Sequence, residues 1–118
     1  MSVNYSEMAV SKLEYVRVAE VGDLVNGERL FVEIDDFSIV VFNIAGKLFA
    51  IEDVCSHDNG PLGDGDLEEE HEIVCPRHGA HFDVRNGEAL TFPAVTDIPA
   101  YPVQIVDGFI EVGIPSDS

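Results

Sequence analysis

The chain has 118 residues, of which 23 are Asp or Glu and only six are Lys or Arg, so its formal net charge is −17 at pH 7. So strong a negative charge argues against nucleic acids and anionic membrane surfaces as partners, because both are polyanions. The length is typical of a single domain. We expect residues 1–118 to form one domain, with mobile tails at about 1–7 and 115–118.

The sequence indicates β-structure from end to end. Apolar runs rich in β-branched and aromatic residues, several of them alternating with polar residues, predict strands. The predicted strands cover residues 13–18, 29–34, 38–44, 47–54, 72–74, 81–84, 103–106 and 109–112. No segment has the periodicity of a helix of normal length, so the chain is predicted to be all-β.

Turn residues separate these runs. Asn86-Gly87 and Asp107-Gly108 are the clearest hairpin signals, because Asn-Gly and Asp-Gly favour the left-handed conformations of two-residue turns. Residues 16–24 predict an edge strand followed by a short turn. Together these features indicate antiparallel sheets joined by short connections.

Two short motifs contain both cysteines of the chain, and each pairs a cysteine with a histidine. The motifs are Cys55-Ser56-His57 and Cys75-Pro76-Arg77-His78, with 17 residues between His57 and Cys75. A disulfide would leave the histidines unexplained. Zinc accepts such ligands, but structural zinc sites usually take both sulfurs from one C-x-x-C turn. One sulfur and one nitrogen from each loop favours a binuclear [2Fe–2S] centre with two thiolates on one iron and two imidazoles on the other.

These motifs, together with Pro61-Leu62 and Gly79-Ala80-His81-Phe82-Asp83, resemble the two cluster-binding loops of the Rieske family. The resemblance runs from about Arg29 to the C-terminus. It implies antiparallel sheets in a sandwich or partial barrel, with both loops at one end. It further implies one Rieske [2Fe–2S] cluster per chain, with Cys55 and Cys75 on the inner iron and His57 and His78 on the outer one.

Four positions differ from the high-potential branch of that family, which belongs to membrane complexes. That branch has an extra cysteine in each loop, where this chain has Gly60 and Arg77, so the disulfide between those cysteines is absent. It also has Ser and Tyr hydroxyls, where this chain has Ala80 and Phe82. Hydrogen bonds to sulfur raise the potential of an Fe–S centre, so their loss predicts a low potential.

The resemblance implies a ferredoxin rather than an enzyme that acts alone. The chain would carry single electrons from an NAD(P)H-dependent flavoprotein reductase to a terminal non-haem iron oxygenase of the ring-hydroxylating type. One alternative is a Rieske-type small subunit of an assimilatory nitrite reductase. Another, from a different class, is a zinc-stabilised interaction module. His71 and His81 are expected to be non-ligands, His71 as a solvated loop residue and His81 as a structural one.

An acidic stretch connects the two motifs. Residues 58–72 contain seven carboxylates and no Lys or Arg. This predicts that the reductase and the oxygenase each dock with a basic face of their own on the acidic surface near His57 and His78. The glycines of the two loops, Gly60, Gly63 and Gly79, are expected to let backbone amides approach the cluster. The N-terminus has no signal-peptide pattern, and unpaired cysteines suit a reducing compartment, so a cytoplasmic location is expected.

Overall fold

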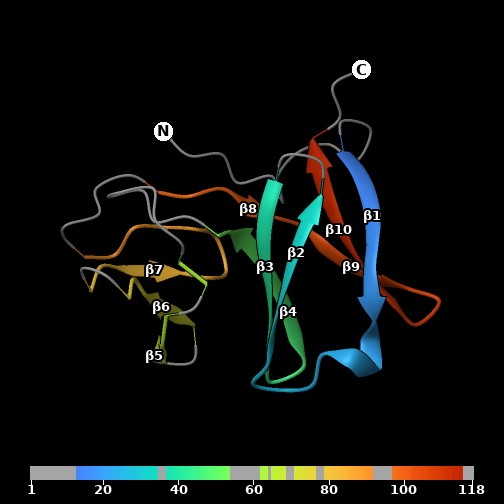
Figure 1. Cartoon of the computed structure of the whole chain (residues 1–118), viewed down its shortest axis with the longest axis horizontal. Helices are drawn as coiled ribbons and strands as arrows, with labels where there is room; N and C mark the ends of the chain where they lie inside the picture. The colour runs from blue at the N-terminus through green and yellow to red at the C-terminus, as the bar shows by residue number, and fades with distance from the viewer. Residues whose placement is uncertain are drawn as a thin grey trace.

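The structure is a computed structural model that describes residues 13–34, 37–53, 62–63, 65–68, 71–76, 79–91 and 97–115. Within these residues the chain forms ten strands and one short 3₁₀ helix, η3 (Val21–Asp23). The strands form three antiparallel sheets (Figure 1). The all-β prediction is therefore confirmed. No helix in the described segments is long and apolar enough to span a bilayer.

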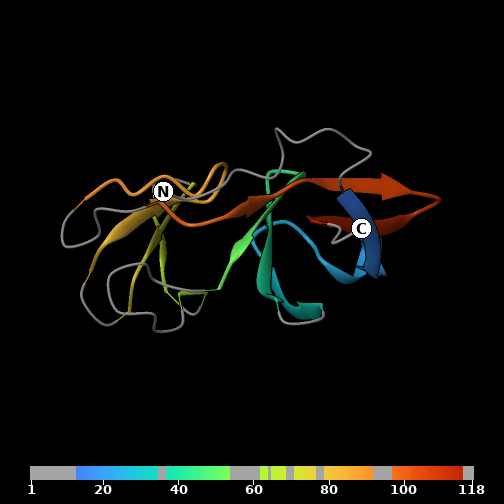
Figure 2. The same ribbon diagram turned by 90° about the horizontal axis from the view of Figure 1, so that it is seen from above.

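The three sheets are here called terminal, central and small. The terminal sheet has the strand order β1 (Leu13–Glu20), β10 (Phe109–Pro115), β9 (Val103–Val106). The central sheet has the order β2 (Arg29–Ile34), β3 (Phe37–Ile44), β4 (Lys47–Glu52), β8 (Ala100–Tyr101). The small sheet has the order β5 (Leu67–Glu68), β6 (Glu72–Val74), β7 (His81–Asp83). Figures 1 and 2 show the central sheet between the other two.

Strand β3 explains this arrangement, because successive side chains of a strand point to opposite faces. Val40 and Phe42 pack into one core, which contains Cys75, Ala80 and residues of the small sheet. Ile39 and Val41 pack into a second core with residues of the terminal sheet. All four are at most 1 % exposed. A strand buried on both faces reads as a continuous apolar run, as residues 39–42 do.

One of the two predicted two-residue hairpins is confirmed, and the other prediction is wrong. Asp107-Gly108 joins β9 to β10, with φ values of 53° and 82°. Asn86-Gly87 does not form a two-residue hairpin, because only Gly87 adopts a positive φ, 80°. The Gly87 N–H donates to the Asp83 carbonyl at 2.7 Å, and the Asp83 N–H donates to the Glu88 carbonyl at 2.9 Å. The chain therefore makes a longer reversal that returns alongside β7.

Strand boundaries differ from the predictions mainly where strands are very short. Strands β5 and β8 have two residues each, too few for a recognisable alternation, and sequence analysis missed both. Strand β4 ends at Glu52 and β7 at Asp83, slightly earlier than predicted. Strand β1 extends to Glu20 before η3, and β10 extends to Pro115, which pairs with Leu13. Of the predicted tails, at about 1–7 and 115–118, residues 1–7 and 116–118 lie outside the described residues, whereas Pro115 belongs to β10.

Asp83 ends β7 and is the one buried charged residue identified in the described core, at 4 % exposure. Its Oδ1 accepts hydrogen bonds from the Arg85 N–H and Nε, and its Oδ2 accepts one from Arg85 Nη2 at 2.8 Å. Burial by itself would raise the pKa of Asp83. The hydrogen bonds and positive charge of Arg85 outweigh it and hold that pKa below its ordinary value.

We expect Asp83→Ala to lower the free energy of unfolding at neutral pH by about 1–3 kcal/mol, because the hydrogen bonds between Arg85 and the buried carboxylate are lost. Folding lowers the pKa of Asp83, so the ionised carboxylate stabilises the fold at pH values above the pKa of the unfolded state, which is about 4. This stabilisation is lost as the pH falls through the pKa of the folded state. The difference between wild type and variant should therefore narrow below about pH 4. Urea unfolding at a series of pH values measures it. An equal difference at acid and neutral pH would contradict the proposed role of the charge.

Candidate metal centre

Cys75 directly follows β6 and begins a tight turn. The Cys75 N–H donates to the Ala80 carbonyl at 2.7 Å, and the Gly79 N–H donates to the Cys75 carbonyl at 2.9 Å. Gly79 has a φ of +77°, a backbone conformation that residues with a Cβ rarely adopt. The turn thus requires glycine here, and it fixes the backbone on both sides of the predicted ligand residues.

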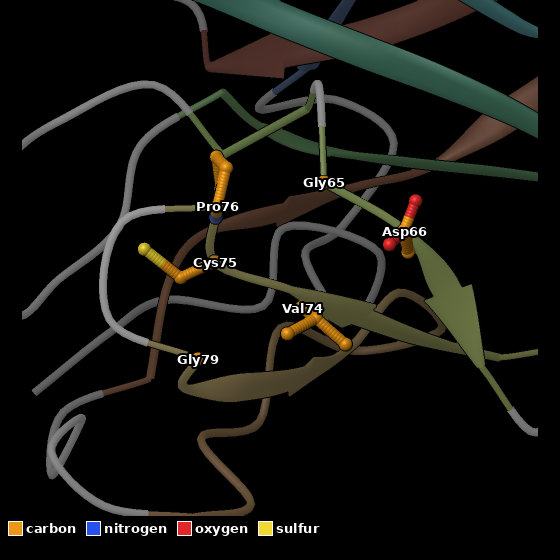
Figure 3. Close-up of a pocket in the computed structure, with 6 residues that line it drawn as sticks. All are labelled: Gly65, Asp66, Val74, Cys75, Pro76 and Gly79. Atoms are coloured by element: carbon orange, nitrogen blue, oxygen red, sulfur yellow. The ribbon is translucent and has the colours of Figure 1, made fainter.

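The Cys75 thiol is free and buried, with 1 % of the residue exposed. It borders a pocket of about 380 Å³ whose lining is Gly65, Asp66, Val74, Cys75, Pro76 and Gly79. In Figure 3 the Cys75 sulfur points away from Val74 and Asp66. A buried thiol at the edge of a cavity, with no disulfide partner in the described part of the chain, has the chemistry that a thiolate ligand to iron requires.

The segment that follows the first motif lies against the Cys75 turn. Leu62 is fully buried in the same core as Cys75. The Val74 N–H donates to the Asp66 carbonyl at 2.9 Å. A Cβ on Gly65 would lie 1.8 Å from the Val74 carbonyl oxygen, so only glycine allows these two backbones to approach so closely. The fold therefore brings the end of the first predicted loop to the second.

Of the four predicted ligands, the structure places Cys75. Cys55, His57 and His78 lie outside the described residues, as do Gly60, Pro61 and Arg77. Among the described residues no group of three or more His, Cys, Asp or Glu side chains could hold a metal ion. The four-residue ligand set therefore stays a prediction, with which the buried thiol of Cys75 agrees.

The two other histidines both lie beside the carboxylate of Glu72. His81 Nδ1 lies 3.0 Å from Glu72 Oε1, across the β6–β7 pair, and the His81 N–H donates to Thr91 Oγ1. His71 Nε2 lies 3.8 Å from the other oxygen of Glu72, and the His71 side chain is one-third exposed. These contacts support the expectation that His71 and His81 are not cluster ligands.

The expected role of the loop glycines is corrected in part. The amides of Leu62 and Gly63 are engaged within the protein, since both donate to Oδ1 of Asp53, at 2.9 and 2.6 Å. The Gly79 amide is likewise engaged by the Cys75 carbonyl. A Cβ at Gly63 would lie 2.5 Å from an atom of the Phe31 ring and 3.1 Å from Oδ1 of Asp53, so a larger residue would fit there only if one of these side chains shifted.

Two polar residues that hold this segment, Asp53 and Arg29, were not predicted from the sequence. Arg29 Nη1 donates to the carbonyls of Gly63 and Gly65, both at 2.5 Å. Asp53 could have been suspected, because it stands two residues before Cys55 in the sequence. Arg29 is more than 30 residues from the turn it binds, so no local pattern could have connected them.

Comparison with known proteins resolves which kind of centre this is. The model of the Rieske [2Fe–2S] domain matches residues 14–102. The ferredoxin subunit of 3-phenylpropionate/cinnamic acid dioxygenase from Escherichia coli K12 is 37 % identical over 95 residues, which cover 80 % of this chain and 89 % of that protein. The chain belongs to the Rieske [2Fe–2S] family. The expected cofactor, a Rieske-type cluster, is thereby confirmed.

Solved structures agree with this assignment. The ferredoxin of carbazole 1,9a-dioxygenase from Nocardioides aromaticivorans IC177 is 33 % identical, with a TM-score of 0.79, and the match covers 86 % of this chain and 98 % of that one. A chain in a complex of oxygenase and ferredoxin of carbazole 1,9a-dioxygenase has the same TM-score at 24 % identity, over 88 % of this chain and 96 % of that one, and shows the fold alone. The expected class, a Rieske ferredoxin that is not catalytic by itself, is confirmed. These matches do not favour the nitrite reductase or zinc alternatives.

In this Rieske domain two of the four positions that differ from the high-potential branch are apolar and fully buried. Ala80 and Phe82 each have 0 % exposure and pack in the core that contains Cys75. Ala80 also accepts the hydrogen bond from the Cys75 amide through its carbonyl. Neither side chain can donate a hydrogen bond to a sulfur atom, which is the condition on which the predicted low potential depends.

Proposed function

We propose that Cys55, His57, Cys75 and His78 hold the Rieske cluster and that this ferredoxin passes single electrons to the terminal oxygenase of a ring-hydroxylating system. The observation that carries the proposal is the buried, free thiol of Cys75 at the pocket edge, in a chain similar over most of its length to dioxygenase ferredoxins. When bound, the cluster supplies one-electron redox chemistry. The chain supplies two thiolates, two imidazoles and an apolar core beneath them.

The electron donor we propose is an NAD(P)H-dependent flavoprotein reductase, which would dock on the same acidic side as the oxygenase. Residues 58–72 contain seven carboxylates and no Lys or Arg. Of these, the structure describes Asp66, Glu68 and Glu72. Asp66 and Glu68 are exposed, and Asp66 lines the pocket beside Cys75, whereas Glu72 is engaged by His81. Exposed carboxylates next to the site would attract a basic partner face.

We further propose that the protein works in the cytoplasm. The unpaired thiol of Cys75 supports this location, because free cysteines persist in reducing compartments.

Reconstitution tests the proposed function. The holoprotein should contain iron, show a Rieske-type EPR spectrum after reduction with dithionite, and restore NAD(P)H-dependent turnover when combined with a ferredoxin-dependent reductase and oxygenase. A protein that contains zinc, gives no EPR signal and restores no turnover would end the electron-carrier proposal.

The potential of the cluster should rise when hydroxyls are introduced at the two buried apolar positions. A hydrogen bond to a charged group is worth about 1.5–3 kcal/mol, and about 1.4 kcal/mol corresponds to ~59 mV for one electron. Each hydrogen bond that forms with the reduced cluster should therefore raise the midpoint potential by about 60–130 mV, so the double variant Ala80→Ser/Phe82→Tyr should raise it by on the order of 100–250 mV. Redox titration followed by circular dichroism measures the shift.

Phe42→Tyr is the matched control for this experiment. Phe42 is equally buried in the same core, but it lies on β3 of the central sheet. An equal rise of the potential in Phe42→Tyr would show that core polarity in general, rather than hydrogen bonding at positions 80 and 82, sets the potential.

A further inference from the structure

We propose that Arg29 and Asp53 are positioning residues for the cluster, which together hold the end of the first ligand loop against the Cys75 turn. The inference rests on the proposed ligand set, because it concerns the loop that contains Cys55 and His57. Neither residue is itself a proposed ligand. They act through the backbone of Leu62, Gly63 and Gly65, all of which the structure describes.

Asp53 joins the two ends of that loop. It directly follows β4, and its Oδ1 accepts hydrogen bonds from the amides of Leu62 and Gly63. The intervening residues 54–61 include Cys55 and His57. Both hydrogen bonds have a charged acceptor, which makes them stronger than bonds between neutral groups. One carboxylate oxygen therefore closes this loop at its base and reduces the entropy that ordering the loop costs.

Arg29 binds the opposite polar groups of the same turn. From β2 its Nη1 donates to the carbonyls of Gly63 and Gly65, while its guanidinium carbon lies 5.4 Å from the centroid of the Phe42 ring. Asp53 thus takes two amides of the turn and Arg29 takes two carbonyls. Between them they fix its orientation from two places in the central sheet, the start of β2 and the residue that follows β4.

The turn so held is in direct contact with Val74, the last residue of β6 before the second loop. Gly65 approaches the Val74 carbonyl so closely that a Cβ would collide with it, and Asp66 accepts the Val74 amide. Val74 is adjacent to Cys75, and Figure 3 shows Gly65 and Cys75 around the same pocket. A displaced turn would therefore change how the first loop meets the Cys75 sulfur. We infer that Arg29 and Asp53 set the relative placement of the two loops.

The test is the rate at which an iron chelator removes iron from the oxidised holoprotein, together with EPR of the reduced protein and its midpoint potential. Loss of residues that orient metal ligands typically weakens binding about 10–100-fold, so Arg29→Ala and Asp53→Ala should each lose iron about tenfold faster or more. Their EPR spectra and potentials should also change. Arg29→Lys and Asp53→Asn, which each keep one hydrogen-bonding group, should show smaller effects of the same sign.

Arg17→Ala and Asp23→Ala are the matched controls. Arg17 pairs with Glu111 at 3.5 Å in the terminal sheet, and Asp23 accepts the Glu20 amide at 3.3 Å, so each loses a comparable interaction elsewhere. Both should keep the wild-type iron-loss rate, spectrum and potential. Because the residues bind one turn, the double variant Arg29→Ala/Asp53→Ala should lose iron more slowly than the product of the two single effects predicts.

The inference would be overturned if the Arg29 and Asp53 variants, the conservative ones included, lost iron no faster than Arg17→Ala and Asp23→Ala. It would also be overturned by faster loss with an unchanged spectrum and potential, which would indicate general destabilisation. Failure of the proposed ligand set would appear separately, as a Rieske EPR spectrum that survives replacement of His57 or His78.

Discussion

His57→Ala and His78→Ala are each expected to abolish the Rieske EPR spectrum and the transfer of electrons to an oxygenase. The reason is the ligand chemistry: two neutral imidazoles on one iron distinguish a Rieske centre from a ferredoxin centre with four cysteines, and they raise its potential. Cys75→Ser should prevent normal assembly, because it removes the buried thiol that borders the pocket. Iron content per chain and EPR of the reduced protein measure both effects.

His57→Cys offers a sharper version of this experiment. If the variant assembles, a third thiolate should lower the midpoint potential by on the order of 100 mV or more, towards the values near −400 mV of plant-type centres. His71→Ala and His81→Ala are the controls, since both side chains contact Glu72. They should keep the Rieske spectrum. Retention of that spectrum in His57→Ala or His78→Ala would refute the ligand assignment.

Electron transfer to and from this ferredoxin should slow steeply as salt is added. Electrostatic steering raises association rates by about 10–1000-fold at low ionic strength, and screening removes this gain once the Debye length falls to about 8 Å at physiological salt. Because the net charge is −17 and the partner face is basic, the rate of electron transfer should fall by about tenfold or more between low and physiological ionic strength. Stopped-flow reduction by the reductase at increasing salt concentration measures it.

A pair of charge-neutralised variants locates the surface. Asp66→Asn/Glu68→Gln removes two exposed carboxylates on the side of the molecule that contains Cys75. Glu14→Gln/Asp107→Asn removes two exposed carboxylates from the terminal sheet, on the other side of the central sheet (Figure 1). The first variant should slow reduction at low salt more than the second. Equal effects would show that net charge acts rather than a local docking face, and a rate independent of salt would contradict electrostatic docking altogether.

The parts of the fold that could be predicted are those specified by neighbouring residues. The alternation of β2, the apolar run of β3 and the Asp107-Gly108 hairpin each depend on a few adjacent side chains, and all three were predicted. Strands β5 and β8 were not, because two residues become a strand only when another strand offers them hydrogen bonds. The prediction of a two-residue hairpin at Asn86-Gly87 was wrong for a related reason. The conformation of this turn depends on β7 and on the Ile98 carbonyl, 1.9 Å from where a Gly87 Cβ would lie.

The candidate site divides in the same way. The ligand types and their spacing are local, so Cys55-x-His57 and Cys75-x-x-His78 sufficed to predict the cofactor, and the family assignment confirmed it. The partners of the backbone amides near the motifs, those of Leu62, Gly63 and Gly79, could not be predicted in this way. The place of these residues beside the motifs suggested amides directed at the cluster, whereas the folded chain uses those amides for Asp53 and Cys75.

By itself, the sequence determined that this protein is an acidic, all-β carrier of a Rieske cluster, since a metal centre is specified by which donor atoms are present and at what spacing. Only the tertiary structure decided what holds those donors in place. Arg29 is more than 30 residues from the turn at Leu62–Gly63, and residues 54–61 separate that turn from Asp53. The three meet because β2 and β4 flank β3 in one sheet. Hydrogen bonds between distant strands form only after the chain has folded, so no local pattern encodes them.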